Sequence, residues 1–237
     1  MADESPAVTL EAVSEKLKNI YHRLLDNYGP QRWWPADEPF EVMVGAILTQ
    51  SAAWLNVEKA IANLKKAQAL TPRALRGLKQ PELAALIRPS GYYNAKARKL
   101  KALACWLGEG YGDDLNRLFT LDTACLRQQL LAVHGIGPET ADSIMLYAAG
   151  RPLFVIDAYT RRIIDRIGLL PDGNSYAAYQ SLFSDNLPAD TRMFNEYHAL
   201  LVCLGKDVCR PRPFCRRCCL GGICRSSDTN ELVQKGW

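Results

Sequence analysis

Apolar residues recur every three to four positions along most of this chain of 237 residues, as they do on one face of an α-helix. The first such stretch covers residues 8–28 and ends at Gly29 and Pro30, which both stop helices. No stretch alternates between apolar and polar residues for long enough to predict a strand. The sequence therefore predicts an all-α fold, with further helices at 40–50, 56–67, 81–87, 95–106, 123–132, 138–149, 157–167, 174–184 and 189–204, and one opened by Pro72.

Composition excludes a disordered chain and a membrane protein. Apolar residues make up 48% of the sequence, too many for a disordered chain. No apolar run approaches the roughly 18 residues that a membrane-spanning helix needs. Residues 1–16 are acidic and polar, unlike the basic and apolar start of a signal peptide. We therefore expect a cytoplasmic protein without membrane contact.

The formal net charge of +4 is too small to indicate a partner, but the charges are unevenly distributed. Between residues 198 and 225 there are six basic residues and one acidic residue. Such a basic segment suits a polyanion such as a nucleic acid. A solvated tail is the alternative for this segment taken alone.

A Gly-x-Gly turn joins two predicted helices in residues 130–149. Gly135 and Gly137 allow positive φ and leave the backbone uncovered, and Pro138 opens the second helix. The N–H groups at such a helix start attract a phosphate without reading base sequence. The alternative is an ordinary corner between two helices of a bundle.

Asp157 follows the apolar run 153–156 and stands at the start of the next predicted helix. An aspartate there can be a plain N-cap, worth about 1 kcal/mol. It can also be a buried carboxylate that stabilises positive charge on a sugar or activates a water, as cleavage of a glycosidic bond requires.

Five of the eight cysteines lie between residues 209 and 224. In a reducing compartment, clustered cysteines indicate metal ligands before disulfides, and four thiolates suit zinc or a [4Fe–4S] cluster. Zinc ribbons have two tight cysteine pairs, whereas here one tight pair is flanked by single cysteines at equal gaps. One spacing uses Cys209, Cys215, Cys218 and Cys224 as the metal ligands and leaves Cys219 over, and Cys219 in place of Cys218 is the alternative.

In order and spacing, the hairpin at 133–141, the segment 155–157 and the cysteine set resemble the endonuclease III family of the helix-hairpin-helix DNA glycosylase superfamily. The resemblance covers nearly the whole chain. It implies a monomeric, nucleoid-associated base excision repair glycosylase that flips a damaged base out of double-stranded DNA and hydrolyses its N-glycosidic bond. By it, Asp157 matches the catalytic aspartate, and the four cysteines hold a [4Fe–4S] cluster, although the family's first cysteine gap is commonly one residue longer.

The resemblance also implies two helical lobes flanking a DNA-binding cleft. Residues 41–151 form a six-helix barrel lobe that contains the helix-hairpin-helix at 130–149. Residues 1–40 and 152–237 form a discontinuous lobe with the catalytic aspartate and the cluster loop at 209–224.

Several DNA contacts follow from the same resemblance. Gln50 matches the position where the family inserts a glutamine into the base stack, and its alternative is a surface residue at a helix end. The cluster loop carries arginines that can meet phosphates. The residues expected to contact DNA are Gln50, His134, Gly135, Ile136, Gly137, Glu139, Thr140 and Arg212.

Glu139 departs from the pattern of the bifunctional members of the family. They carry a lysine two residues after the second hairpin glycine, which attacks the sugar and leads to strand cleavage. A carboxylate at this catalytic position cannot form the Schiff base, so we predict a monofunctional glycosylase. Lys96, Lys99 and Lys101 lie on another predicted helix, and nothing in the sequence places them in the cleft.

Trp33, Trp34 and Phe40 are the candidates to line the base pocket, although large aromatic residues beside prolines are more often packing residues. The segments 33–35, 40–48 and 54–60 resemble the 3-methyladenine DNA glycosylase III branch, which removes alkylated purines. These bases are cationic, and aromatic faces attract cations by about 0.5–2 kcal/mol. Mismatched thymine or uracil and oxidised bases are alternative substrates. A non-catalytic DNA-damage-binding protein and a zinc-stabilised interaction module are alternative functions.

Overall fold

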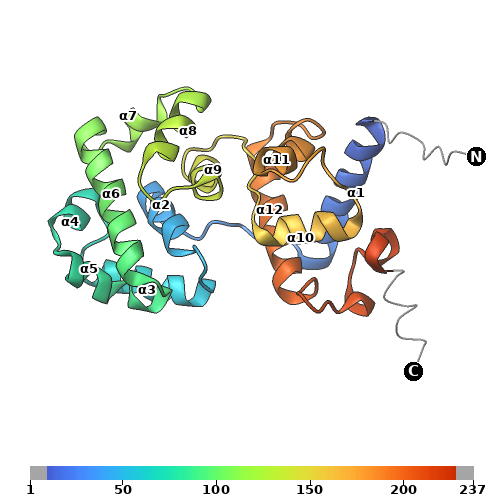
Figure 1. Ribbon diagram of the computed structural model, residues 1–237, viewed down its shortest axis with the longest axis horizontal. Coiled ribbons are helices and arrows are strands. Elements are labelled where there is room, and N and C mark those ends of the chain that lie inside the picture. The colour runs from blue at the N-terminus through green and yellow to red at the C-terminus, as the bar shows by residue number, and fades with distance from the viewer. Residues whose placement is uncertain (1–9, 228–237) are drawn as a thin grey trace, which may run out of the picture. The chain divides into compact units, whose positions relative to one another are not determined.

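The computed structural model describes residues 10–227, and within them every regular element is a helix (Figure 1). The prediction of an all-α fold is therefore confirmed. Val8 of the first predicted helix and both ends of the predicted discontinuous lobe, residues 1–9 and 228–237, lie outside the described residues. No helix among residues 10–227 is long and apolar enough to cross a membrane.

Residues 34–151 form one compact unit. Its core helix α2 is hydrophobic all round and has nine buried residues, as expected of a helix enclosed by others. Helix α6 packs against α4 and α5 (Figure 1). The unit has eight α-helices where six were expected: α2 (Pro39–Leu48), α3 (Trp54–Lys66), α4 (Pro72–Gly77), α5 (Gln80–Leu86), α6 (Tyr93–Tyr111), α7 (Leu115–Phe119), α8 (Thr123–Ala132) and α9 (Pro138–Tyr147).

A second compact unit joins the start of the chain to its last third, residues 1–33 and 152–237. Helix α12 packs against both α10 and α1. The rings of Phe154 and Phe183 stack with centroids 3.7 Å apart, and the buried Tyr197 hydroxyl donates to the Leu17 carbonyl oxygen (2.9 Å). The helices of this unit are α1 (Leu10–Tyr28), α10 (Ala158–Ile167), α11 (Tyr176–Ser184) and α12 (Thr191–Asp207), with short 3-10 turns at Cys215–Arg217 and Gly221–Ile223.

The boundary between the units lies before Trp34, seven residues earlier than the expected position 41. The Trp34 ring packs edge-on against Trp54 and tilted against Tyr147, both at 5.3 Å between centroids. It also lies so close to Gly45 that a Cβ there would be 2.8 Å from a ring carbon. These contacts attach the segment after residue 33 to the unit of residues 34–151.

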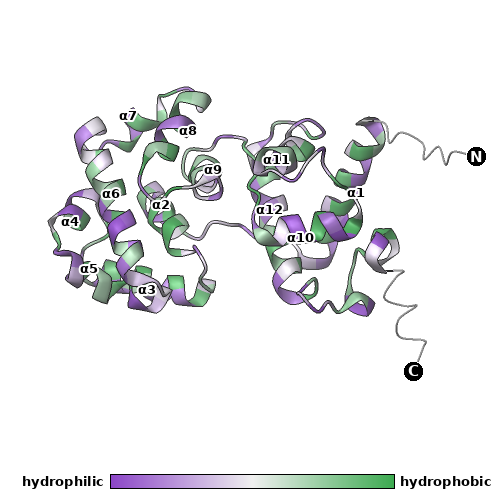
Figure 2. Ribbon diagram, viewed as in Figure 1, coloured by the Kyte–Doolittle hydropathy of each residue, from purple (hydrophilic) through white to green (hydrophobic). Residues whose placement is uncertain are grey.

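Most helices carry polar and apolar residues on opposite faces. Along α3 and α6, hydrophilic and hydrophobic residues alternate on the ribbon (Figure 2). In α3 the buried residues are Val57, Ala60, Ile61 and Leu64, which recur at the helical spacing. The period of the sequence pattern thus identifies the face that each helix buries.

Candidate functional site

The turn between α8 and α9 has one strained residue. Gly135 has φ +84°, a left-handed conformation that favours glycine, whereas Gly137 is extended (φ −93°, ψ −179°), as any residue can be. Both glycines allow positive φ, and of the two Gly135 adopts it. A Cβ at Gly137 would meet no atom within 4 Å, so the backbone at the start of α9 is uncovered.

The two helices of this hairpin are fixed by a buried ion pair. Asp142 of α9 is fully buried, and its carboxylate accepts from the Arg127 guanidinium of α8 at 2.6 and 3.1 Å. Breaking such a pair leaves an uncompensated buried charge, which is strongly destabilising. The pair therefore holds the angle between the helices that present the turn.

The predicted hairpin residues differ in their exposure to solvent. His134, Gly137 and Glu139 are exposed, Gly135 is half-buried, and Ile136 and Thr140 are buried (5% and 6% exposed). Backbone and exposed side chains of this turn are thus open to a partner, whereas Ile136 and Thr140 support it from below.

Gln50, which follows α2, lies on the hairpin. Its Nε2 donates to the Gly135 carbonyl oxygen (3.1 Å) and to Thr140 Oγ1 (2.9 Å), and its Oε1 accepts from Lys99 Nζ. Because Lys99 can only donate, these contacts fix which way the side-chain amide of Gln50 points. The structure thus brings three predicted DNA-contacting residues, Gln50, Gly135 and Thr140, together in one network.

Sequence reasoning missed Lys99. Its side chain lies against the hairpin, where a Cβ at Gly135 would be 2.3 Å from Lys99 Cγ. The sequence could offer no signal for this contact, because Lys99 and Gln50 are 49 residues apart and meet only in the folded unit.

Lys96 is almost completely buried and links the end of α2 to the 3-10 turn Arg88–Ser90. Its Nζ donates to the carbonyl oxygens of Leu48 (2.8 Å) and Ser90 (2.7 Å). Burial, together with the nearby charge of Lys99, lowers the pKa of Lys96 to about 8. Two residues beyond Ser90, Tyr92 is 74% exposed with a left-handed backbone (φ 44°), so an aromatic ring projects at the start of α6.

The aromatic candidates for a base pocket differ in exposure. Phe40 is a core residue (5% exposed), so its ring is covered by the protein. Trp34 is half-buried within the cluster with Trp54 and Tyr147. Trp33 is also half-buried and belongs to the other compact unit.

Asp157 is the N-cap of α10, and its side chain is 13% exposed. Its Oδ1 accepts from the Thr160 backbone N–H (2.7 Å), as an N-cap does. Its Oδ2 lies 3.7 Å from Nε2 of His198, which is buried in α12. The preceding residues Phe154, Val155 and Ile156 are buried and anchor this carboxylate at the edge of its unit's core.

The loop at 209–224 is anchored to α10. The Arg166 guanidinium donates to Cys209 Sγ (3.3 Å) and to the carbonyl oxygens of Arg210 (2.6 Å) and Pro211 (2.9 Å). Cys224 Sγ in turn donates to the Arg166 carbonyl oxygen (3.4 Å). The four arginines that this loop exposes are Arg210, Arg212, Arg216 and Arg217.

The cysteines fit a metal cluster in number and chemistry. Burial, together with the nearby Cys219, Cys209 and Cys224, raises the pKa of Cys218 to about 11, so these thiols share one region. As they stand, however, no three His, Cys, Asp or Glu side chains within residues 10–227 are close enough together to hold a metal ion. The number and type of these side chains thus suit a cluster, whereas their sulfur atoms do not lie close enough together to coordinate one.

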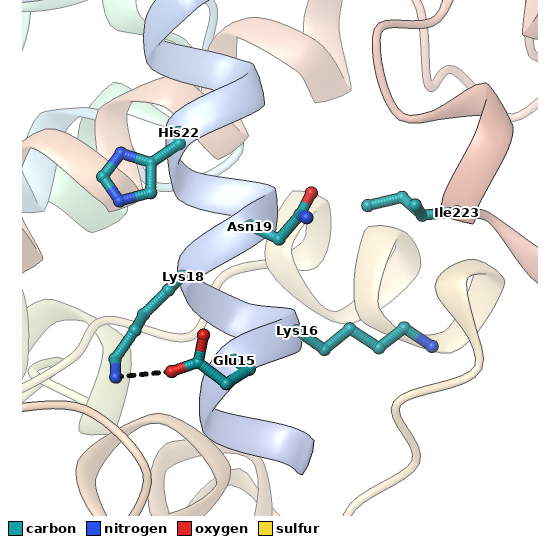
Figure 3. A pocket seen from close by; sticks show the side chains of 6 residues that line it. All are labelled: Glu15, Lys16, Lys18, Asn19, His22 and Ile223. Atoms are coloured by element: carbon teal, nitrogen blue, oxygen red, sulfur yellow. Dashed lines mark hydrogen bonds and ion pairs between the residues drawn. The ribbon is translucent and has the colours of Figure 1, made fainter. Parts of the chain in front are cut away.

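Two surface hollows lie away from these residues. One, of about 650 Å³, lies between α1 and Ile223. On α1, Lys16 and Asn19 lie on the side of Ile223, whereas His22 points to the other side (Figure 3). Lys18 forms an ion pair with Glu15 at 2.9 Å. The other, of about 320 Å³, is lined by three acidic residues, two of which, Asp37 (2.7 Å) and Glu41 (2.9 Å), form ion pairs with Lys65. Neither hollow is lined by a predicted site residue.

Comparison with known proteins gives the same family at the level of sequence and of fold. The chain is 44% identical over 213 residues to a protein of Methanocaldococcus jannaschii provisionally assigned as a DNA repair glycosylase, covering 90% of this chain and 97% of that protein. It is 28% identical over 188 residues to endonuclease III of Sulfolobus acidocaldarius, covering 78% and 81% of the two chains. The crystal structure of an H. pylori 3-methyladenine DNA glycosylase bound to 1,N6-ethenoadenine matches with a TM-score of 0.70 and 27% identity, covering 82% of this chain and 97% of that one.

The family model described as HhH-GPD superfamily base excision DNA repair protein matches residues 44–189. This range contains Gln50, the hairpin and Asp157, and it ends before the cysteine set. With the relative that is 44% identical over most of both chains, the match establishes the resemblance drawn from the sequence. The chain belongs to the HhH-GPD superfamily of base excision DNA repair glycosylases.

Proposed function

We propose that this protein is a monofunctional DNA glycosylase that removes a damaged base, preferably an alkylated purine, from double-stranded DNA. The observation that carries the proposal is the geometry of Asp157. Its carboxylate is held by a backbone N–H on one oxygen, lies beside a buried histidine on the other, and remains partly exposed. A fixed anion of this kind suits a reaction that develops positive charge.

The chemistry expected of Asp157 is hydrolysis of the N-glycosidic bond. As the bond between the base and C1′ breaks, the electron pair leaves with the base and the sugar becomes oxocarbenium-like. The Asp157 carboxylate stabilises this charge or takes a proton from the attacking water. The water oxygen then bonds to C1′ and its proton passes to Asp157 or to solvent. A cationic alkylated purine leaves as a neutral base, whereas a neutral base must take up a proton as it leaves.

The hairpin, Gln50 and the arginine loop are the proposed DNA contacts. The uncovered start of α9 suits a backbone phosphate, since N–H groups at a helix start attract anions. Gln50 would enter the stack after it exchanges its contacts with Lys99, Thr140 and Gly135 for contacts with bases. The exposed arginines of the loop, Arg212 among them, would pair with phosphates.

Glu139 supports a monofunctional enzyme. It is exposed in the first turn of α9, at the position where a lyase would carry its lysine. Its carboxylate cannot form a Schiff base with the sugar. Lys99 is the amine in contact with the hairpin, and it is the residue to test if the strand breaks without alkali.

The preference for alkylated purines rests on the aromatic residues and on one relative. Trp33 and Trp34 remain half-buried, so part of each ring is accessible, whereas Phe40 supports the fold from the core. The H. pylori enzyme, 27% identical, is named for 3-methyladenine. Mismatched thymine or uracil and oxidised bases belong in the same test as competing substrates.

The deciding experiment measures base release from duplexes that each carry one lesion, before and after alkali. We expect release of an alkylated purine, strand breakage only after alkali, and a loss of at least about 100-fold in Asp157→Asn, because the neutral amide cannot stabilise the developing charge. Asp190→Asn is a matched control, since Asp190 caps α12 in the same way.

Three other results would contradict parts of the proposal. Strand breakage without alkali would overturn the monofunctional assignment. Release of only thymine, uracil or an oxidised base would overturn the substrate. Binding of damaged DNA without release of any base would favour a damage-binding protein instead.

We also propose that Cys209, Cys215, Cys218 and Cys224 hold a [4Fe–4S] cluster, which would fix the arginine loop rather than take part in bond cleavage. The anchoring of Cys209 and Cys224 to Arg166 supports this assignment. Protein purified without oxygen should contain about four iron and four sulfide per chain. Cys218→Ser should lose them and Cys219→Ser should keep them, whereas stoichiometric zinc without sulfide would contradict the cluster.

A further inference from the structure

His198 is a buried titratable group that the mechanism above does not use. It lies in α12 with only 7% of its surface exposed. Its Nε2 is 3.7 Å from Asp157 Oδ2, while Asp157 Oδ1 is engaged by the Thr160 N–H at 2.7 Å. The two oxygens of the carboxylate therefore face two different groups, one on α10 itself and one on α12.

We propose that His198 is a positioning residue for Asp157, and that its neutral imidazole orients the carboxylate toward the sugar without cancelling its charge. The inference rests on the proposed function. A separation of 3.7 Å is longer than a hydrogen bond of about 2.9 Å, but contacts of this kind are often long before substrate binds and shorten in the complex.

The neutral form follows from the surroundings of His198. Burial lowers the pKa of His198, and the negative charge of Asp157 partly opposes this by raising it. A neutral imidazole has one N–H, and on Nε2 it can donate to Asp157 Oδ2. An imidazolium would instead pair with Asp157 and reduce the negative charge that the reaction needs.

Arg162 of α10 and Tyr21 of α1, the two elements that pack against α12, are engaged elsewhere. On α10, the Arg162 guanidinium donates to the carbonyl oxygens of Gly205 (3.0 Å) and Cys209 (2.8 Å). On α1, the Tyr21 ring packs against Tyr197 at 5.3 Å, and burial raises its pKa. Asp157 is thus the charged group that acts on His198.

Substitutions test the positioning role through the rate of base release at saturating enzyme. His198→Phe should slow single-turnover release about 10- to 100-fold with unchanged affinity for DNA, since a misplaced reacting group costs up to about 100-fold. His198→Gln keeps an N–H donor and should recover most of the rate. His22→Gln, at an exposed position of α1, is the control and should leave the rate unchanged.

A second readout does not depend on activity. The chain has three histidines, so their ring signals can be assigned by substitution and titrated by NMR. Asp157→Asn should lower the pKa of His198 further, because it removes the charge that raises it. In the wild-type protein, the rate of base release should fall as the pH is lowered, because His198 becomes protonated.

The outcomes separate the inference from the proposed function. A His198 pKa that does not respond to Asp157→Asn would overturn the contact, and a folded His198→Phe that releases base at the wild-type rate would overturn the positioning role. If the wild-type protein releases no base from any lesion, the proposed function is wrong, and so is a role of His198 in that function. A retained response of the His198 pKa would then show that the contact itself was correctly assigned.

Discussion

In the proposed function, Glu139 occupies a position where one side chain decides between two reactions. It is exposed in the first turn of α9, and the positive end of the helix dipole favours its negative charge there. A lysine at the same position would be disfavoured as a cation, so its neutral amine, the nucleophilic form, would be more populated. The fold around the hairpin is therefore compatible with either residue, and the chemistry depends on which one is present.

Glu139→Lys should consequently give the protein a lyase activity. We expect a covalent complex with duplex DNA containing an abasic site when borohydride reduces the imine, and strand breakage without alkali. Glu139→Gln, which has no amine, is the matched control and should trap no DNA.

Wild-type protein serves as the baseline for this experiment. If Glu139→Lys traps no more DNA than wild type, position 139 does not face the sugar. If wild type itself is trapped and Lys99→Met abolishes trapping, then Lys99 supplies the amine and the monofunctional proposal fails.

At the scale of the helices, local signals in the sequence were sufficient to predict where most of them begin. Pro lies at the first turn of α2, α4, α5 and α9, and aspartates cap α7, α8, α10 and α12 with side-chain bonds to the first turn. These effects act within four residues, so they can be read without knowing the fold. The position of Asp157 was predictable for the same reason, whereas its contact with His198 was not, because the two are 41 residues apart.

Helix α6 shows where local reasoning fails. It was expected at 95–106 but covers Tyr93–Tyr111, passing through Gly108 and Gly110. A Cβ at Gly108 would lie 2.5 Å from the Arg76 guanidinium, which crosses there to pair with Asp113. The glycine thus leaves room for the Arg76 guanidinium and does not mark a helix end. The same helix carries Lys96 and Lys99, which contact Leu48 and Gln50. No local pattern in the sequence indicated these contacts.

At the scale of the whole molecule, the proposed functions are divided between the two compact units. Residues 34–151 contain the hairpin, Gln50 and Lys99, and residues 1–33 and 152–237 contain Asp157, His198 and the cysteine set. The first unit is continuous in sequence and has its own buried core, including α2. It therefore meets the usual conditions for folding alone.

We expect a fragment of residues 34–151 to be helical by circular dichroism and to melt cooperatively. It should bind duplex DNA weakly and release no base, because it lacks Asp157. Residues 152–237 are the matched control and should not fold alone, since α12 would lose α1 with its fully buried Leu17, Ile20 and Leu24. A fragment 34–151 without a cooperative transition would contradict the independence of this unit.

The hydrogen bond from Tyr197 to Leu17 spans 180 residues, and this has a consequence for synthesis of the protein on the ribosome. At about 5–20 residues per second, roughly 10 to 40 s pass between translation of α1 and translation of its partner α12. The unit of residues 34–151 is complete within that interval, so a nascent chain acquires its hairpin before it acquires the packed environment of Asp157. A chain whose translation stops before α10 would carry the proposed DNA contacts of the hairpin without the proposed catalytic carboxylate of Asp157.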